Sequence, residues 1–326
     1  MSCGISVLFC LLTTAFLITS PAEAQQPLSK LIRIGYLGNA ASDAARERAF
    51  FQSLREHGWI EGQNIVVERR YWENRAERLP AFADELVRLK TDIIVTTAGS
   101  AALVVKKTTK TIPIVMITSG DAVTQGIVDS LARPGGNVTG LTNISPDTNR
   151  KRLEIIKETV PKLSRLAVLG CSRRSPLSSE QWSDTETVAV GFGIQIQAVE
   201  VNGPEEIERE LAAATRRHAD ALFVLDCSRI PSSNTVALAT KSRLPAIYPS
   251  ARYLDAGGLM VYATDPIDMG RRAATYVDKI LRGMKPADLP VERPAKFQLV
   301  INLKAAKQIG LTIPPNVLAR ADRVIR

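Results

Sequence analysis

The sequence is poor in the residue types on which most hydrolytic and metal-dependent active sites depend. It contains only two histidines, His57 and His218, and both lie at the C-termini of predicted helices, where the negative end of the helix dipole favours a partly positive ring. Neither histidine lies at the carboxyl end of a predicted strand, so no Ser-His-Asp set is formed. Ligand spacing typical of zinc is absent as well. The sequence therefore predicts no catalytic residues and no metal site, and a protein that is not an enzyme.

Aromatic residues and nucleotide-binding motifs are also scarce. Aromatics make up 5% of the chain, which excludes the stacking platform of a protein that binds single-stranded nucleic acid. Gly35 and Gly38 do not form a GxGxxG motif, and Ala98-Gly99-Ser100 lacks the lysine of a P-loop. We expect no cofactor and no nucleic-acid partner.

The basic residues form no long run, although the net charge is +9. Lysine and arginine are mixed with acidic residues along the chain. The basic clusters are short, as in Arg69-Arg70 and Arg150-Lys151-Arg152. A tail that binds polyanions would need a longer block of one sign. We interpret these clusters as parts of solvated faces.

The first 24 residues predict a secretory signal peptide. The apolar run from Ile5 to Ile18 carries no charge and is short for a membrane span. Ala22-Glu23-Ala24 precedes Gln25 as a cleavage site, so we expect cleavage after Ala24 and export to the periplasm. The absence of lysine and arginine before the apolar run is unusual, and an uncleaved anchor is the alternative. No second run of spanning length follows, so we expect no direct membrane insertion of the mature chain.

Strand-like and helix-like segments alternate along the rest of the chain. In the first half, strands are predicted at 31–37, 64–68, 92–96, 112–117 and 138–141, and helices at 43–57, 75–89, 101–107 and 123–131. In the second half, strands are predicted at 165–169, 194–201, 220–225, 245–248, 258–262 and 297–301, and helices include 146–160, 205–215, 269–282 and 303–309. Strands in this alternation pair in parallel with helices on both faces. The pattern predicts an α/β protein of two doubly wound parallel-sheet lobes.

Polar side chains follow many of these strands. Ligands of open α/β sheets bind at the carboxyl ends of the strands, so we expect a site in the cleft between the lobes. The candidate ligand-binding residues are Asn39, Ala98, Gly99, Ser100, Ser119 and Asp121 in the first half, and Ser172, Asp226, Tyr248, Tyr253 and Asp265 in the second. The helix start at 97–100 suits an anion, and the acids suit an ammonium group. Each residue alone also fits a capping or turn role.

Longer stretches of the chain are similar to a known family. They are Arg33–Gly38, Gly58–Asn64, Thr111–Val115, Ser130–Gly140, Ala256–Met260, Tyr276–Ile280, Lys285–Pro290, Phe297–Lys304 and Gly310–Pro314. The run Arg133-Pro-Gly-Gly-Asn-Val-Thr-Gly140 and the tail are the most specific. With these stretches the chain resembles the tryptophan/tyrosine-type ABC transporter substrate-binding proteins, which have a type I periplasmic binding fold.

The resemblance implies two lobes joined by hinge crossings. It places 31–142 and 264–286 in the first lobe, and 143–263 and 287–326 in the second. It also carries ligand contacts onto the loops after the strands. These are Asn39, Ala98 to Ser100 and Asp121 in the first lobe, with Ser172, Asp226 and Asp265 opposite them or at the hinge.

The departures from the family pattern fall in the same loops. Cys171-Ser-Arg-Arg-Ser-Pro176 stands where the family tends to have Asn-Pro-x-Asn-Pro, and Cys227 stands where it tends to have proline. Gly120-Asp-Ala-Val123 replaces Gly-Asp-Pro-Val. Because the edge of the pocket differs, an aromatic amino acid is not assumed as the ligand.

Cys171 and Cys227 are the two cysteines that follow the predicted signal. In the strand order 2-1-3-4-5, the first and third strands of a lobe are neighbours. Cys171 ends the first such strand of the second lobe and Cys227 follows the third. Strands about 4.8 Å apart bring such residues within disulfide reach, and an exported protein meets an oxidising compartment. We hypothesise a disulfide at the cleft mouth; two buried free thiols are the alternative.

The function predicted from the sequence is that of a solute receptor. We expect it to bind a small polar molecule, such as an amino acid or another zwitterion, and to deliver it to the permease and ATPase of an ABC importer by hinge closure. We expect a monomer. A periplasmic receptor for a membrane sensor is one alternative, and an α/β enzyme is another, although no nucleophile–base pair supports the enzyme.

Overall fold

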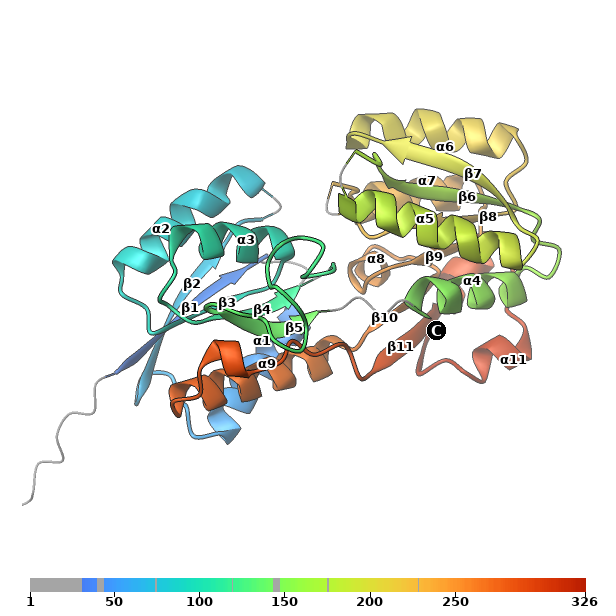
Figure 1. Ribbon diagram of the computed structural model, residues 1–326. Coiled ribbons are helices and arrows are strands. Elements are labelled where there is room, and N and C mark those ends of the chain that lie inside the picture. Colours follow the sequence, from blue (N-terminus) through green and yellow to red (C-terminus); the bar gives the residue numbers. More distant parts are fainter. Residues whose placement is uncertain are drawn as a thin grey trace, which may run out of the picture.

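The computed structural model describes residues 31–39, 44–73, 75–118, 120–142, 147–174, 176–227 and 229–326. In this part of the chain, two separate β-sheets are each covered by helices (Figure 1). The predicted signal peptide at 1–24 lies outside the described residues. Among the residues described, no helix has both the length and the apolar character that a membrane crossing requires.

The first sheet has five parallel strands in the order β2-β1-β3-β4-β5. They are β1 (Ile32–Gly38), β2 (Ile65–Tyr71), β3 (Ile93–Thr96), β4 (Ile114–Thr118) and β5 (Val138–Thr142). Strand β3 is buried along its whole length, as expected for a strand with helices on both faces. This order confirms the predicted doubly wound architecture of the first half.

Helices from two distant parts of the chain cover this sheet. One face carries α2 (Leu79–Arg88), which follows the 3-10 turn η1 (Ala76–Arg78), and α3 (Gly99–Thr108); the other carries α1 (Ala44–Glu56) and α9 (Pro266–Leu281). Helix α9 packs tightly on α1. A Cβ atom on Gly270 would lie 2.4 Å from the carbonyl oxygen of Arg46, so the contact requires glycine.

The second sheet has seven strands in the order β12-β11-β10-β9-β8-β6-β7. They are β6 (Arg165–Cys171), β7 (Gln195–Val201), β8 (Ala221–Val224), β9 (Ala246–Tyr248), β10 (Met260–Thr264), β11 (Phe297–Asn302) and β12 (Arg323–Ile325). Its first five strands in sequence repeat the 2-1-3-4-5 order. All pairs are parallel except β10 with β11.

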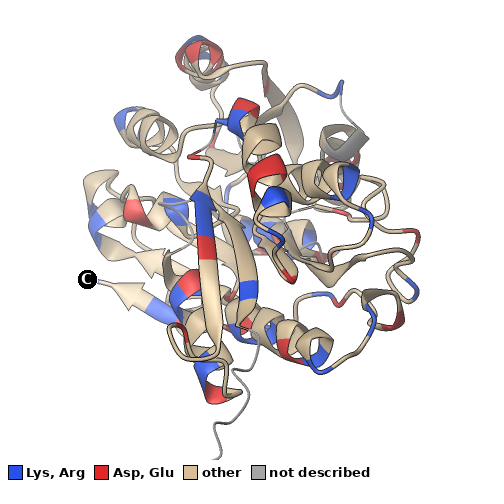
Figure 2. Cartoon of the chain, turned by 90° about the vertical axis from the view of Figure 1, so that its left-hand side faces the viewer, with Lys and Arg blue, Asp and Glu red and all other residues tan. Residues whose placement is uncertain are grey.

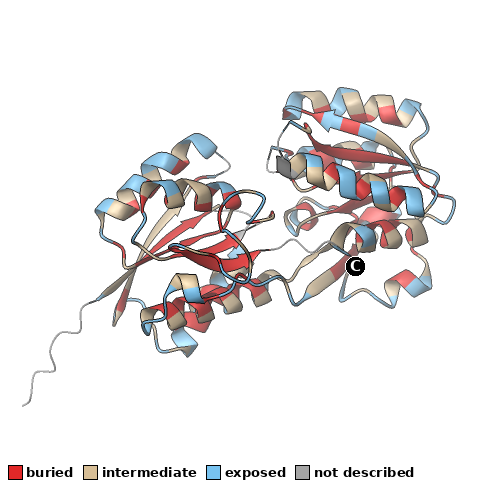
Figure 3. Ribbon diagram, viewed as in Figure 1, coloured by how far each residue is buried: buried red, intermediate tan, exposed pale blue. Residues whose placement is uncertain are grey.

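Two apolar clusters hold helices to the two faces of this sheet. The helices are α4 (Asp147–Thr159), α5 (Pro176–Gly191), α6 (Ile207–Arg216) after η2 (Pro204–Glu206), α7 (Ser232–Lys241), α8 (Arg252–Asp255), α10 (Leu303–Gln308) and α11 (Pro315–Leu318). Leu153, Ile156 and Trp182 join one cluster, whereas Ile207 and Val236 join the other. Buried residues concentrate on the strands and the inner helix faces (Figure 3).

Three chain segments connect the two sheets: β5 to α4, β10 to α9, and α9 to β11 by way of η3 (Pro286–Asp288). The second and third run side by side, because the backbone N–H of Asp265 donates to the carbonyl oxygen of Lys296 at 3.0 Å. The third also lies along β5, where the N–H of Thr142 donates to the carbonyl oxygen of Glu292 at 3.0 Å. These hydrogen bonds couple the crossings into one connection.

Two sequence predictions about the elements are wrong. The segment 123–131 forms turns and not the predicted helix. Asp121 Oδ1 accepts hydrogen bonds from the N–H groups of Val123 and Thr124, and Gly126 follows with a φ of 68°, which a helix does not tolerate. The second wrong prediction is that all strands pair in parallel: β10 is parallel to β9 but antiparallel to β11. Strand β10 leads out of the second sheet and β11 returns to it, so the two must run in opposite directions.

Candidate functional site

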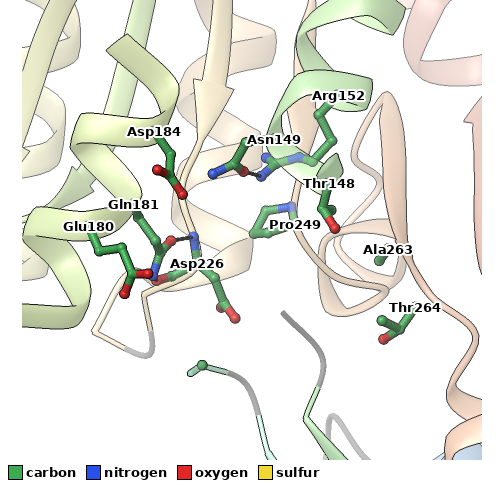
Figure 4. A pocket seen from close by; sticks show the side chains of 11 residues that line it. Thr148, Asn149, Arg152, Glu180, Gln181, Asp184, Asp226, Pro249, Ala263 and Thr264 are labelled. Carbon is green, nitrogen blue, oxygen red and sulfur yellow. Dashed lines mark hydrogen bonds between the residues drawn. The ribbon is translucent and has the colours of Figure 1, made fainter. Parts of the chain in front are cut away.

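A cleft lies where the carboxyl ends of strands from the second sheet approach the loop after β4. Its volume is about 700 Å³, including space open to solvent. The described lining residues are Gly120, Thr148, Asn149, Arg152, Glu180, Gln181, Asp184, Asp226, Pro249, Ala263 and Thr264 (Figure 4). Gly120 belongs to the first half of the fold, whereas the other residues belong to α4, α5 and the ends of β8, β9 and β10. Parallel α/β sheets bind ligands in this position.

Helix α4 places Arg152 at the cleft through its second turn. The side chain is only 2% exposed. Its Nη2 donates to the carbonyl oxygen of Val224 and, at 3.4 Å, to that of Ile247, at or near the ends of β8 and β9. The guanidinium also lies over the ring of Phe223, 4.1 Å from the ring centroid. Arg152 thus fixes the start of α4 against two neighbouring strands.

The charge of Arg152 is held in an apolar setting. Burial lowers its pKa to about 9, although Asp226 and Tyr253 partly oppose this shift. The side chain therefore stays cationic at neutral pH. It has no ion pair with a carboxylate within the described part of the chain, and its Nε has no hydrogen-bond partner there.

The interpretation of the basic clusters as solvated faces needs one correction. Arg69 and Arg70 pair with Glu61 and Glu85 on the surface, and charges of both signs are mixed along the elements shown in Figure 2. Arg152 is different because it lies on the inner face of α4, three and four residues before Ile155 and Ile156, which are buried.

Helix α5 lines the opposite wall with acidic and amide side chains. Gln181 holds the main chain of Asp226 from both sides: its Oε1 accepts from the Asp226 N–H at 3.1 Å, and its Nε2 donates to the Asp226 carbonyl oxygen at 3.3 Å. The Asp226 carboxylate points away from Gln181 into the cleft (Figure 4). Gln181 therefore orients the loop and leaves this carboxylate available to a ligand.

Glu180 and Asp184 lie one turn apart on α5 and line the same cleft. Burial raises the pKa of Glu180, and the negative charges of Asp121 and Asp184 raise it further. Partial burial also raises the pKa of Asp184. Because Asp121 follows β4, carboxylates from both halves of the fold repel one another here. The site has an acidic wall opposite the buried arginine.

The structure places the predicted residues of the first half around the ends of their strands. Asn39 follows β1, Ala98 precedes α3 as its N-cap, and Gly99 and Ser100 begin that helix. The Asp121 side chain caps the turn at 123–124. Ser119 lies outside the described residues. The described lining of the cleft contains Gly120, the neighbour of Asp121, but none of the predicted residues of the first half.

In the second half, Asp226 is the predicted residue that lines the cleft. Ser172 is 7% exposed after β6. Tyr248 and Tyr253 are buried and stacked, with ring centroids 4.7 Å apart, and Asp265 caps α9 by accepting from the Ile267 N–H at 2.8 Å.

Cys171 and Cys227 form a disulfide, with their Cα atoms 5.9 Å apart. The carbonyl oxygen of Cys171 accepts from Trp182 Nε1 at 2.8 Å, and that of Cys227 accepts from Arg252 Nη2 at 2.9 Å. The disulfide joins the last residue of β6 to the loop after the neighbouring strand β8, directly beside Asp226. It therefore limits how far this part of the cleft wall moves.

The polar groups that line the described site can form hydrogen bonds and ion pairs with a ligand. Its polar groups are amides, hydroxyls, carboxylates and one guanidinium. The described residues contain no group of three or more side chains suited to hold a metal ion. Opposite charges on facing walls, without a nucleophile–base pair among the described lining residues, suit the recognition of a charged small molecule.

A family model described as "ABC transporter substrate binding protein" matches residues 38–325. The chain belongs to this family. The family resemblance predicted from the sequence is thereby confirmed, as is the α/β fold of type I periplasmic binding proteins. As a member, the chain is a substrate-binding protein of ABC transport, and the family consists of binding proteins and not enzymes.

Individual relatives span most of the chain. A "Tyrosine-binding protein" from Clostridioides difficile (strain R20291) is 25% identical over 286 residues, which are 86% of this chain and 81% of that protein. The structure of an ABC domain from Streptococcus pneumonia in complex with L-Trp has a TM-score of 0.82 and 27% identity, covering 90% of this chain and 99% of that one. The structure of a conserved domain protein from Vibrio cholerae has a TM-score of 0.82 and 25% identity, and the match covers 90% of this chain and 100% of that one.

Sequence reasoning missed the helical part of the site. The strand-end rule identified Asp226, but Thr148, Asn149 and Arg152 lie in the first two turns of α4, and Glu180, Gln181 and Asp184 lie in α5. A signal for Arg152 was present, because it shares a helix face with the apolar residues Ile155 and Ile156. No comparable signal marks α5, whose charges lie at positions typical of a solvated surface.

Proposed function

We propose that this protein is an extracytoplasmic receptor that binds a small zwitterion of amino-acid type in the cleft and delivers it to an ABC importer. The single observation that carries the proposal is the charge pattern of the cleft, a buried arginine opposite carboxylates on the facing wall. Family membership supplies the transport role. The charge pattern supports the class of ligand.

The wall formed by α4 suits the carboxylate of the ligand. The first turn of this 13-residue helix carries Thr148 and Asn149, and the positive end of a helix dipole stabilises an anion there. Thr148 Oγ1 is buried without a hydrogen-bond partner among the described residues. Arg152 adds a full positive charge behind this turn. A ligand carboxylate would satisfy these groups together.

The Asp226 carboxylate suits the ammonium group. Gln181 already satisfies the main chain of Asp226, so the loop does not have to rearrange when the ligand arrives. A hydrogen bond to a charged group contributes about 1.5–3 kcal/mol. The relatives support this ligand class, since one is named for binding tyrosine and another was solved with L-Trp.

Closure of two lobes over the ligand is the proposed mechanism. We assign 31–142 with 264–286 to the first lobe, and 143–263 with 287–326 to the second. The packing of α9 on α1 and the pairing of β11 with β10 support this division. A ligand that touches both walls favours the closed state by its differential affinity, and the importer's permease would recognise that state. Export with cleavage after Ala24, a periplasmic location and a monomeric state belong to the same proposal.

A thermal-shift screen of the mature protein against amino acids, sugars, nucleosides and organic acids tests the ligand class. A ligand at 100 times its Kd should add about 2.7 kcal/mol of stability. Asp226→Asn should weaken binding about 10- to 100-fold without lowering the melting temperature of the ligand-free protein. Glu208→Gln, on the exposed surface of α6, is the matched control and should bind as the wild type does. If no zwitterion shifts the melting temperature, or if Asp226→Asn binds normally, the proposal is wrong.

A further inference from the structure

The charges around the cleft do not balance. Its described lining contains three carboxylates, those of Glu180, Asp184 and Asp226, against the single guanidinium of Arg152. This surplus of negative charge occurs in a chain whose net charge is +9. A simple zwitterion would bring one charge of each sign and would leave the surplus in place.

Nearby basic side chains do not neutralise the acidic wall. Arg173 is held by Glu186 at 2.6 Å and lies 3.6 Å from Glu200. Arg252 donates to the carbonyl oxygen of Cys227. Within the described part of the chain, neither Glu180 nor Asp184 forms an ion pair with lysine or arginine. Their negative charges are therefore open to a partner from outside the chain.

The arrangement of Glu180 and Asp184 is unfavourable without such a partner. Like charges four residues apart on a helix destabilise it, and Asp121 adds a third negative charge from across the cleft. Glu180 Oε2 is buried and has no hydrogen-bond partner among the described residues. A cation between these carboxylates would relieve both the repulsion and the unsatisfied atom.

The opposite wall supplies an independent indication of the ligand. Arg152 is 2% exposed and lines the cleft, yet its Nε lacks a hydrogen-bond partner among the described residues, as does Thr148 Oγ1. A ligand carboxylate at α4 would use the one positive charge of the cleft. Three carboxylates then face whatever cationic groups the same ligand carries.

The described cleft offers no aromatic side chain for stacking. Recognition of an aromatic ring usually employs such partners, so the composition favours a different ligand side chain.

From these observations we infer that the ligand is a basic amino acid, with its α-ammonium at Asp226 and a second cationic group between Glu180 and Asp184. The inference rests on the proposed function and narrows its ligand class. Lysine and ornithine have the required groups, and arginine offers a guanidinium in place of the second ammonium.

Calorimetric titration of the mature, ligand-stripped protein with L-lysine and L-norleucine tests the inference. Norleucine keeps the α-groups and the straight chain but ends in a methyl group. One added charged contact predicts that lysine binds about 10- to 100-fold more tightly. Glu180→Gln and Asp184→Asn should each reduce this ratio of affinities, because each should weaken the binding of lysine and leave the binding of norleucine unchanged. Glu208→Gln should change neither affinity.

The possible failures are distinguishable. If norleucine or L-tyrosine binds as tightly as lysine, or if both α5 variants retain the full ratio, the inference is overturned while the receptor proposal stands. If cadaverine, which lacks a carboxylate, binds as tightly as lysine, the amino-acid part is overturned. If no amino acid binds and Asp226→Asn behaves as the wild type, the proposed function fails and the inference fails with it. Asp226→Asn should weaken the binding of lysine and of norleucine equally. This result would separate the contact with the α-ammonium group, which both ligands have, from the contact with the second cationic group of lysine.

Discussion

Replacing the buried Arg152 by alanine should destabilise the ligand-free protein by about 2–4 kcal/mol. Hydrogen bonds from a charged donor contribute about 1.5–3 kcal/mol, and the guanidinium donates to the carbonyl oxygens of Val224 and Ile247. Its desolvated contact with the ring of Phe223 adds up to about 2 kcal/mol. Relief from burying a cation offsets part of this loss, because burial already lowers the pKa of Arg152.

Thermal unfolding followed by circular dichroism measures this effect. At about 2–4 °C per kcal/mol for lobes of this size, the melting temperature should fall by roughly 4–16 °C. Arg150→Ala is the matched control, because Arg150 lies on the same helix but is exposed, and surface substitutions usually stay within about 0.5 kcal/mol. The melting temperature of Arg152→Lys should lie between those of Arg152→Ala and Arg150→Ala, because lysine keeps the charge but lacks the planar guanidinium that reaches two carbonyl oxygens.

The reasoning is refuted if Arg152→Ala and Arg150→Ala have the same melting temperature. That result would mean that the Arg152 side chain is solvated, as the sequence alone suggested. Its role in fixing α4, and its place opposite the acidic wall, would then have no support.

Three further predictions concern the disulfide, the acidic wall and the hinge. Without reductant, Cys171 and Cys227 should resist alkylation, and mass spectrometry should detect two added alkyl groups only after reduction. Two modified thiols in the unreduced protein would disprove the disulfide. The bond should contribute about 4 kcal/mol to the free energy of unfolding for a separation of 56 residues. Glu180→Gln should raise the melting temperature of the ligand-free protein at pH 7, because the raised pKa of Glu180 means that its ionised form destabilises the fold. This gain should disappear as the pH falls and the wild-type carboxyl takes up a proton, and an equal gain at all pH values would refute the assignment. Asp265→Ala should cost about 1 kcal/mol by removing the N-cap of α9, seen as a lower denaturation midpoint in urea; an unchanged midpoint would show that the cap does not matter.

The alternation of strands and helices was readable from the sequence because its physical basis is local. Strands such as β3 are buried on both faces and so are mostly apolar, with Thr96 as the last residue of β3, and the helices between them carry one apolar face. The direction of β11 was not readable, because it depends on the chain crossing to the first sheet and back. The apolar spacing at 123–131 reflected packing of Ile127 and Val128 into the core and not a helix.

The site was predictable only where it follows the strand ends. Asp226 lies at such an end, and the sequence identified it. Arg152 and Glu180 line the cleft because of how α4 and α5 are placed against the second sheet. No local pattern marks Glu180. Arg152 shares a helix face with buried isoleucines, but a charged residue on a helix is usually solvated, so the sequence alone favoured a solvated side chain.

Small-angle X-ray scattering with and without a saturating ligand tests the central claim most directly. If two lobes close over a solute held between the walls of the cleft, the radius of gyration should decrease when the best ligand from the thermal-shift screen is added. The decrease should be lost in Asp226→Asn at the same ligand concentration. A ligand that binds by calorimetry but leaves the scattering profile unchanged would contradict the account.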